Sequence, residues 1–240
     1  MKQKAWADVG LNGGITRRDL LYGAAGITAL FCVGEVATGL IGKDRFIRPP
    51  GGQDEEHFLA TCIKCDRCRS ACPLSAVFAV GLEGGLINAR TPYLSFHEGH
   101  YLMPDSGPTF LQPQNPEEGL CLIRQSGGSG YCDFCNRCID ACPTGALKPF
   151  NPLTQWLGLA IIRPDICIAY FELNGCRRCV DSCPFGAITI DSDQRPIVCP
   201  EFCNGCGVCE SICPTNTYQS FKGLTKRGIG VEPAANARPQ

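Results

Sequence analysis

Residues 132–143 read CDFCNRCIDACP, in which three cysteines stand three residues apart and a fourth, four residues further on, precedes a proline. Residues 62–73 and 203–214 repeat this arrangement, and residues 167–184 repeat it in a form whose first two cysteines are separated by eight residues. The chain therefore repeats one small structural unit. The predicted ligand residues are Cys62, Cys65, Cys68, Cys72, Cys132, Cys135, Cys138, Cys142, Cys167, Cys176, Cys179, Cys183, Cys203, Cys206, Cys209 and Cys213.

This spacing predicts [4Fe–4S] clusters, because such a cluster needs four thiolates at four corners of a cube. Three closely spaced cysteines can wrap the backbone around the cube, and in two-cluster ferredoxins the fourth binds the neighbouring cluster. We expect the fourth cysteine of each motif to begin a helix, with the following proline in its first turn. Four motifs predict four [4Fe–4S] clusters.

Zinc sites and disulfides are the competing interpretations of so many cysteines. Structural zinc sites use two pairs of ligands, usually 12–20 residues apart, rather than three clustered cysteines and one before a proline. A disulfide framework favours an even count, whereas the chain has 19 cysteines. The three outside the motifs, Cys32, Cys121 and Cys199, are expected to be spectators.

Composition narrows the fold and the function further. The net charge of −1 lacks the basic excess of nucleic-acid-binding proteins, so no nucleic-acid partner is expected. With 28 Gly and 18 Pro, the chain predicts a loop-rich α+β fold: duplicated bacterial-type 2[4Fe–4S] ferredoxin units with short helices and hairpins. Residues 187–190 and 195–198 are predicted to form one hairpin. No phosphate loop, dinucleotide fingerprint or catalytic triad is present, so the chain is not expected to be an enzyme on its own.

The first 45 residues are typical of an export signal rather than of a domain. A polar region leads to Arg17 and Arg18, and a modestly apolar stretch follows over residues 20–34. This order predicts a twin-arginine signal, which exports folded proteins, and hence a periplasmic location. The stretch is short for a membrane-spanning helix. Whether the signal is cleaved or stays as a weak membrane anchor is left open.

The rest of the chain divides into a four-cluster domain over residues 46–221 and a flexible tail over residues 222–240. A Gly- and Pro-rich insertion over residues 74–131 separates the first two motifs. It is expected either to dock an electron-transfer partner or to cover the first pair of clusters. His97 and His100 within it are interpreted as solvated loop histidines.

Basic residues lie within the cysteine motifs. They either are solvated or favour the reduced clusters and raise their potentials. They are Lys64, Arg67, Arg69, Arg137, Arg177 and Arg178.

The signal, the sequence Arg48-Pro49-Pro50-Gly51 and the four cysteine motifs, with the third one stretched, resemble the MauM/NapG ferredoxin-type proteins over residues 15–215. The resemblance implies a periplasmic electron carrier that works with a quinol-oxidising membrane ferredoxin-type protein. It passes electrons to a periplasmic cytochrome or reductase, in a nitrate reductase or methylamine pathway. Membrane association would come through the partner or an uncleaved signal. The alternative is the iron–sulfur subunit of a molybdopterin oxidoreductase complex.

Similar iron–sulfur subunits of molybdenum oxidoreductases pair the first motif with the fourth and the second with the third. We favour that pairing here, because the long insertion separates the first two motifs. It groups Cys62, Cys65 and Cys68 with Cys213, and Cys203, Cys206 and Cys209 with Cys72. It also groups Cys132, Cys135 and Cys138 with Cys183, and Cys167, Cys176 and Cys179 with Cys142. The alternative pairs the first motif with the second and the third with the fourth.

Overall fold

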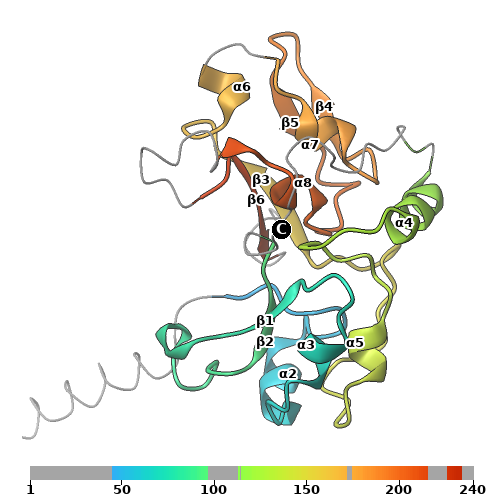
Figure 1. Cartoon of the computed structure of the whole chain (residues 1–240), viewed down its shortest axis with the longest axis vertical. Coiled ribbons are helices and arrows are strands. Elements are labelled where there is room, and N and C mark those ends of the chain that lie inside the picture. Colours follow the sequence, from blue (N-terminus) through green and yellow to red (C-terminus); the bar gives the residue numbers. More distant parts are fainter. Residues whose placement is uncertain (1–44, 97–112, 114, 172–174, 216–225, 234–240) are drawn as a thin grey trace, which may run out of the picture.

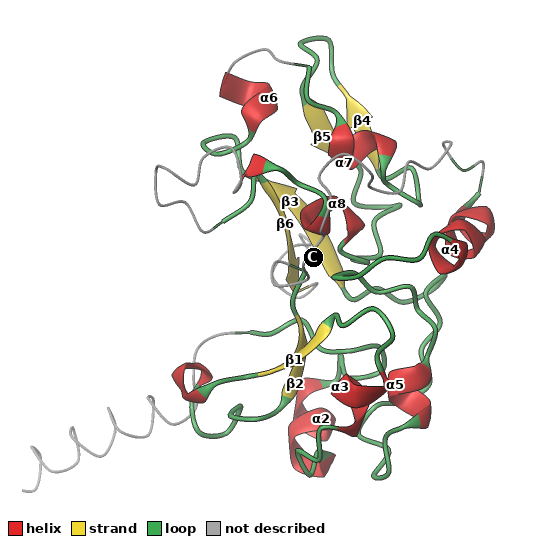
Figure 2. Cartoon of the chain, in the orientation of Figure 1, coloured by secondary structure: helices red, strands yellow, loops and turns green. Residues whose placement is uncertain are grey.

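The computed structural model describes residues 45–96, 113, 115–171, 175–215 and 226–233. The predicted export signal, His97 and His100 therefore lie outside the described residues. Within the described residues, no helix is long and apolar enough to cross a membrane. Short helices and small sheets joined by long loops confirm the predicted α+β, loop-rich class (Figure 2).

The described chain forms two regions (Figure 1). The N-terminal half holds α2 (Glu55–Thr61), α3 (Arg67–Ala71), β1 (Val77–Ala79), the 3-10 helix η1 (Leu82–Gly84), β2 (Pro92–Leu94), α4 (Pro116–Gln125) and α5 (Arg137–Asp140). The C-terminal half holds β3 (Gly158–Ile162), α6 (Ile168–Phe171), α7 (Arg178–Asp181), β4 (Ile188–Ile190), β5 (Pro196–Val198), α8 (Val208–Ser211) and β6 (Ile229–Pro233).

Three antiparallel sheets of two strands each organise the two halves. In the C-terminal half, β4 pairs with β5 so that Ile188 lies opposite Val198, which confirms the predicted hairpin. β3 and β6 flank the third and fourth motifs and pair over five residues, from Gly158 with Pro233 to Ile162 with Ile229. In the N-terminal half, the remaining pair, β1 and β2, lies within the insertion.

The prediction of a flexible tail from residue 222 is wrong for residues 229–233, which form β6. Two forces hold this strand. Ile229 and Val231 bury their side chains in the core, and the Val231 N–H donates a hydrogen bond to the Glu210 carboxylate at 2.7 Å. Just before the strand, Arg227 donates hydrogen bonds to the backbone carbonyls of Glu210 and Ser211 at the end of α8. The strand was not predicted, because polar and small residues flank its short alternation of apolar side chains.

Arg48 holds the start of the N-terminal half in place. Its guanidinium is 3% exposed and bonds the Glu55 carboxylate at 2.5 and 2.9 Å. It also donates to Asn88 Oδ1 at 2.7 Å and to Thr91 Oγ1 at 2.8 Å, both in the insertion, and lies 4.8 Å from the centre of the Phe58 ring. A buried charge needs this many partners, so the arginine ties α2 to the loop between β1 and β2.

The adjoining residues Pro49 to Gly52 fasten the same segment to the second cysteine motif. The Lys148 N–H donates to the Gly51 carbonyl at 3.0 Å. Gly51 has a φ of +86°, and a Cβ there would collide with the Lys148 carbonyl, so only glycine fits. The sequence Arg48-Pro49-Pro50-Gly51 therefore has a structural role, because it joins the start of the domain to the motif around Cys142.

The insertion packs across both halves. Pro92 in β2 lines a cavity of the N-terminal half, whereas Phe96, which is 2% exposed, lies against Gly207 of the fourth motif. Gly119 of α4 approaches the Pro184 carbonyl so closely that a Cβ would collide with it. The described part of the insertion thus covers regions of both halves, not only of the first pair of motifs.

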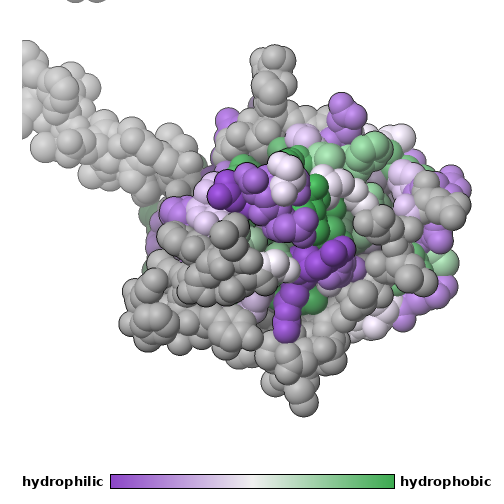
Figure 3. All heavy atoms as spheres, turned by 90° about the horizontal axis from the view of Figure 1, so that it is seen from above, coloured by the Kyte–Doolittle hydropathy of each residue, from purple (hydrophilic) through white to green (hydrophobic). Residues whose placement is uncertain are grey.

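On the face seen in Figure 3, hydrophilic side chains flank a narrow hydrophobic strip.

Candidate metal centres

The sixteen predicted cysteines gather into four groups, here called sites 1 to 4 after the motif that supplies three of the four thiols. Three of these groups line cavities: site 1 with Cys62, Cys65, Cys68 and Cys142, site 3 with Cys167, Cys176, Cys179 and Cys213, and site 4 with Cys203, Cys206, Cys209 and Cys183. In site 2, Cys72 lies close enough to Cys132, Cys135 and Cys138 to act electrostatically on all three.

This grouping corrects the favoured pairing of motif one with four and two with three. Cys142 joins motif one instead of motif three, and Cys213 joins motif three instead of motif one. The insertion does not separate the first two motifs, because the chain returns to its starting point where the Gly130 N–H donates to the Leu74 carbonyl at 2.8 Å. Long surface loops that return to their origin cost little extra closure entropy. Helices α3 and α5 can therefore pack together, as α7 and α8 do.

The prediction that each fourth cysteine begins a helix is also wrong for motifs one, two and three, where turns follow the cysteine, whereas in motif four Thr215 is helical directly after Cys213-Pro214. Each short helix carries the third cysteine of its motif and ends just before the fourth, as α3 does at Cys72, whose φ of −76° and ψ of 112° are extended. The proline after the fourth cysteine lacks an N–H, so the helix that carries the third cysteine cannot continue through it. The chain then turns away, and the fourth thiol can face the neighbouring site.

The loops between the first three cysteines owe their shape to residues with positive φ. The residues directly before and after the second cysteine have φ of +57° and +66° in motif one, +57° and +62° in motif two, and +78° and +85° in motif four. They are Lys64 and Asp66, Phe134 and Asn136, and Gly205 and Gly207. Successive amides in such conformations form concave sites for anions. A cluster held by four thiolates is such an anion.

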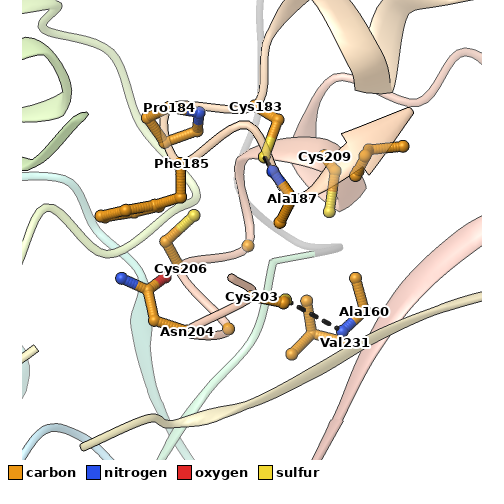
Figure 4. A pocket seen from close by; sticks show the side chains of 13 residues that line it. Ala160, Cys183, Pro184, Phe185, Ala187, Cys203, Asn204, Cys206, Cys209 and Val231 are labelled. Carbon is orange, nitrogen blue, oxygen red and sulfur yellow. Dashed lines mark hydrogen bonds between the residues drawn. The ribbon is translucent and has the colours of Figure 1, made fainter. Parts of the chain in front are cut away.

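Hydrogen bonds to sulfur add to this environment (Figure 4). The Ala160 N–H donates to Cys203 Sγ at 3.4 Å and the Ala187 N–H to Cys183 Sγ at 3.3 Å. Figure 4 shows the thiols of site 4 around a common space. The Thr215 hydroxyl also lies 3.2 Å from Cys213 Sγ, and the Thr144 hydroxyl 3.8 Å from Cys142 Sγ. We did not predict these threonines, although the repeated Cys-Pro-Thr of motifs two and four was a signal.

Burial makes most of these thiols hard to ionise. It raises the pKa of Cys68 to about 11 and that of Cys138 to about 12, and it also raises the pKa values of Cys132, Cys206 and Cys209. At Cys142 burial also acts to raise the pKa, but the amides of Leu147, Thr144 and Ala146 outweigh it and lower the value. Buried thiolates need a compensating positive charge, which bound iron would provide.

The geometry fits clusters better than single ions. All 18 cysteines of the described residues are free thiols. Among these residues, no group of three or more His, Cys, Asp or Glu side chains is arranged to hold one metal ion. The thiols of sites 1, 3 and 4 instead surround a space, and backbone N–H groups donate to the sulfurs of Cys203 and Cys183 in site 4. This arrangement suits a cube of alternating iron and inorganic sulfide, because the cube needs room and its sulfides need hydrogen-bond donors.

The basic residues of the motifs have different surroundings. Arg69 bonds Asp66 at 2.6 Å and Arg177 bonds Asp181 at 2.9 Å, both at the surface, whereas Lys64 donates to the Ile87 carbonyl at 3.0 Å. Arg178 lines the cavity of site 3, so its charge is placed to act on that site.

The two remaining cysteines of the described residues, Cys121 and Cys199, lie outside the four sites. Cys121 is exposed on α4 and accepts a hydrogen bond from Gln125 Nε2 at 3.0 Å. The Cys199 N–H donates to the Ala187 carbonyl, and its side chain lines none of the three cavities. Cys32 lies outside the described residues.

Comparisons with known proteins agree with this geometry. A 4Fe–4S dicluster domain matches residues 174–217, which hold most of motif three and all of motif four, and 4Fe–4S binding domains match residues 129–148 and 59–81. The ferredoxin-type protein NapF of Escherichia coli (strain K12) is 31% identical over 180 residues, 71% of this chain and 81% of NapF. The methylamine utilization ferredoxin-type protein MauM of Paracoccus denitrificans (strain Pd 1222) is 28% identical over 216 residues, 83% of each chain. The E. coli ferredoxin-type protein NapG is 28% identical over 183 residues, 70% of this chain and 65% of NapG.

Proposed function

The chain belongs to the ferredoxin-type iron–sulfur proteins, and on that premise we propose that it is an electron carrier with four [4Fe–4S] clusters, one in each of the four sites. The observation that carries the proposal is the set of four cysteine quartets, each completed by a cysteine of the neighbouring motif. Each half then forms one two-cluster ferredoxin unit. A bound cluster accepts and releases one electron without moving atoms far.

The residues of this chain would hold the clusters in three ways. The thiolates bind the irons, and the positive-φ loops aim backbone N–H groups at the sulfides. Buried aromatic side chains such as Phe58 and Phe134 keep water from the sites. Hydrogen bonds and solvent exposure set cluster potentials, so site 1, with its exposed Cys65, and site 4, with buried Cys183, Cys206 and Cys209, are expected to differ in potential.

We infer the direction of electron flow from the resemblance to the MauM/NapG proteins. We propose that a quinol-oxidising membrane partner reduces this protein and that it reduces a periplasmic cytochrome or reductase, in a nitrate reductase or methylamine pathway. The names of the Nap and methylamine utilization relatives support this assignment. In this scheme the protein serves a quinol dehydrogenase system without catalysing a reaction on a substrate of its own.

The first test is chemical analysis of protein purified without oxygen. We expect about 16 iron and about 16 acid-labile sulfide per chain. Protein that instead holds zinc and little iron would disprove the electron-carrier proposal.

The pairing of the motifs has its own test. Replacing Cys142 with serine should damage the cluster of site 1, whose other ligands come from motif one, and leave that of site 2 in place. Electron paramagnetic resonance of the reduced variant, with Cys121→Ser as the matched control, identifies the lost signal. Loss confined to site 2 would show that the motifs do not exchange their fourth cysteines.

The proposed location also has a test. A periplasmic site reached by the twin-arginine route predicts that changing Arg17 and Arg18 together to lysine leaves the protein in the cytoplasm. Cell fractionation measures this, and unchanged export of the variant would remove the periplasmic assignment.

A further inference from the structure

A backbone hydrogen bond joins two predicted ligand residues from different halves. The Cys132 N–H donates to the Cys206 carbonyl at 2.8 Å. Cys132 belongs to site 2 in the N-terminal half, and Cys206, which is 7% exposed, belongs to site 4 in the C-terminal half. Sites 2 and 4 therefore meet through a single hydrogen bond between their own ligand residues.

Side chains close this junction against solvent. Phe134, in the loop of site 2, is fully buried, and its ring meets that of Phe185 edge to face with centroids 6.3 Å apart. Phe185 lines the cavity of site 4. Nearby, α4 packs on the backbone at Pro184 through Gly119. Buried aromatic side chains and the close approach of α4 therefore pack this junction.

The other two sites lie away from the junction. The cavity of site 1 is lined only by residues between 58 and 147, all in the N-terminal half. The cavity of site 3 is lined only by residues between 162 and 229, all in the C-terminal half. Sites 1 and 2 exchange their fourth cysteines beneath the packed helices α3 and α5, and sites 3 and 4 do the same beneath α7 and α8. Each outer site therefore has one neighbour.

We infer that the four sites form one series in the order site 1, site 2, site 4, site 3, and that electrons cross between the halves at the contact of Cys132 with Cys206. The inference rests on the proposed function. In this step one electron leaves the reduced group at site 2 and arrives at the oxidised group at site 4. No bond forms or breaks, and external one-electron donors and acceptors act at the two ends.

The order differs from the order of the motifs along the chain. A series that followed the sequence would place site 3 beside site 2 and leave site 4 at the end. The geometry instead makes site 3, with its stretched motif, the terminal site of the C-terminal half. Electron tunnelling weakens steeply with distance and is favoured along covalent and hydrogen-bonded paths, so a hydrogen bond between two ligand residues is a direct route between the halves.

Magnetic coupling between neighbouring reduced clusters tests the order on the full chain. Fully reduced wild type is compared by electron paramagnetic resonance with Cys65→Ser, which removes site 1, and Cys135→Ser, which removes site 2. Iron analysis confirms that each variant keeps about three quarters of its iron. Loss of site 1 should leave three coupled signals. Loss of site 2 should leave site 1 as an isolated, uncoupled signal while sites 4 and 3 stay coupled.

Coupling of site 1 to the C-terminal half in the absence of site 2 would overturn the inference. Cys176→Ser removes site 3, which the inference places at the far end of the series. Loss of all coupling between the halves in this variant would also overturn the inference. If Cys135→Ser loses all its iron, Cys72→Ser removes the same site through the other motif. Wild type without clusters would refute the proposed function, whereas wild type with four clusters coupled in another order would refute this inference alone.

A conservative change at the junction gives a second readout. Phe185→Leu keeps an apolar side chain but removes the ring contact with Phe134, and Ile197→Leu on β5, an exposed position, is its control. After rapid reduction of part of the clusters, redistribution between the halves should slow several-fold in Phe185→Leu and not in the control. Equal rates in the two variants would show that the contact between Phe134 and Phe185 takes no part in the crossing.

Discussion

Each half of the molecule carries two cysteine motifs, but the two halves are closed by different means. The C-terminal half brackets its motifs between β3 and β6, which pair over five residues. The N-terminal half has no such strand pair in its described residues and is closed by the side chain of Arg48 and by Gly51 against Lys148. The cysteine spacing thus dictates the metal-binding loops, while the scaffold around them is free to vary.

The loops themselves differ between the halves at the residue before the second cysteine. The C-terminal half has glycine there in both motifs, Gly175 and Gly205, whereas the N-terminal half has Lys64 and Phe134 at the same positive φ. Holding a residue other than glycine in this backbone conformation costs about 1–3 kcal/mol of stability. The N-terminal half accepts this cost, and at Phe134 it gains a buried aromatic contact in return.

The largest expected effect comes from Arg48→Met, which should selectively weaken the N-terminal half. The change leaves Asn88 and Thr91 buried without their partner, and breaking such a buried charge network costs about 3–5 kcal/mol. We expect sites 1 and 2 to lose their iron and sites 3 and 4 to keep it, as measured by iron analysis and paramagnetic resonance. Arg45→Met, at an exposed arginine three residues earlier, is the control. Simultaneous loss of all four signals would mean that the halves do not close independently.

Exchanging residue types at matched loop positions sharpens the comparison. Gly205 has a φ of +78°, and in Gly205→Ala the new Cβ would collide with the backbone of Gly158. We therefore expect strain and overpacking to lower the free energy of unfolding by about 2–4 kcal/mol. In Lys64→Gly this backbone strain is relieved, and the free energy of unfolding should change by no more than about 1 kcal/mol. Denaturant midpoints of the iron-loaded proteins measure both. Equal effects at the two positions would show that the glycine is not required.

A smaller effect is expected at α4, the helix that packs on the other half. Asn115 caps this helix by accepting a hydrogen bond from the Glu118 N–H at 2.8 Å. Asn115→Ala should cost about 1 kcal/mol, whereas Asn115→Asp should keep the cap. Hydrogen exchange of the α4 amides reports the change, which should be absent from β3 and β6. Equal exchange in both variants would show that the cap does not stabilise α4.

The smallest expected effect is at the sheet that closes the C-terminal half. Arg163 meets Glu232 at 3.2 Å across β3 and β6, and both side chains are partly exposed. Glu232→Gln should therefore cost only about 0.2–1 kcal/mol, and less at high salt. Thermal unfolding at low and high salt measures it. A cost as large as that of Arg48→Met would contradict the conclusion that backbone pairing, rather than this ion pair, closes the half.

Sequence predicted the chemistry more fully than the scaffold. The cysteine spacing identified the sixteen thiols that the structure gathers, because the ligand geometry of a cluster acts over a few residues of chain. The exchange partner of each fourth cysteine depends instead on where residues 74–131 return, at Leu74 and Gly130, and spacing carries no record of that. The hairpin of β4 and β5 was evident from its local alternation and turn. β6 was missed because five residues become a strand only when β3 is present to pair with them.

The exchange of Cys72 and Cys142 between neighbouring sites has a consequence for how the protein matures. No motif can complete a cube from its own thiols while it leaves the ribosome. On the proposed function, iron and sulfide can fill the first pair of sites only after residue 142 has been made, and the second pair only after residue 213. A truncated chain would therefore offer incomplete sets of thiols.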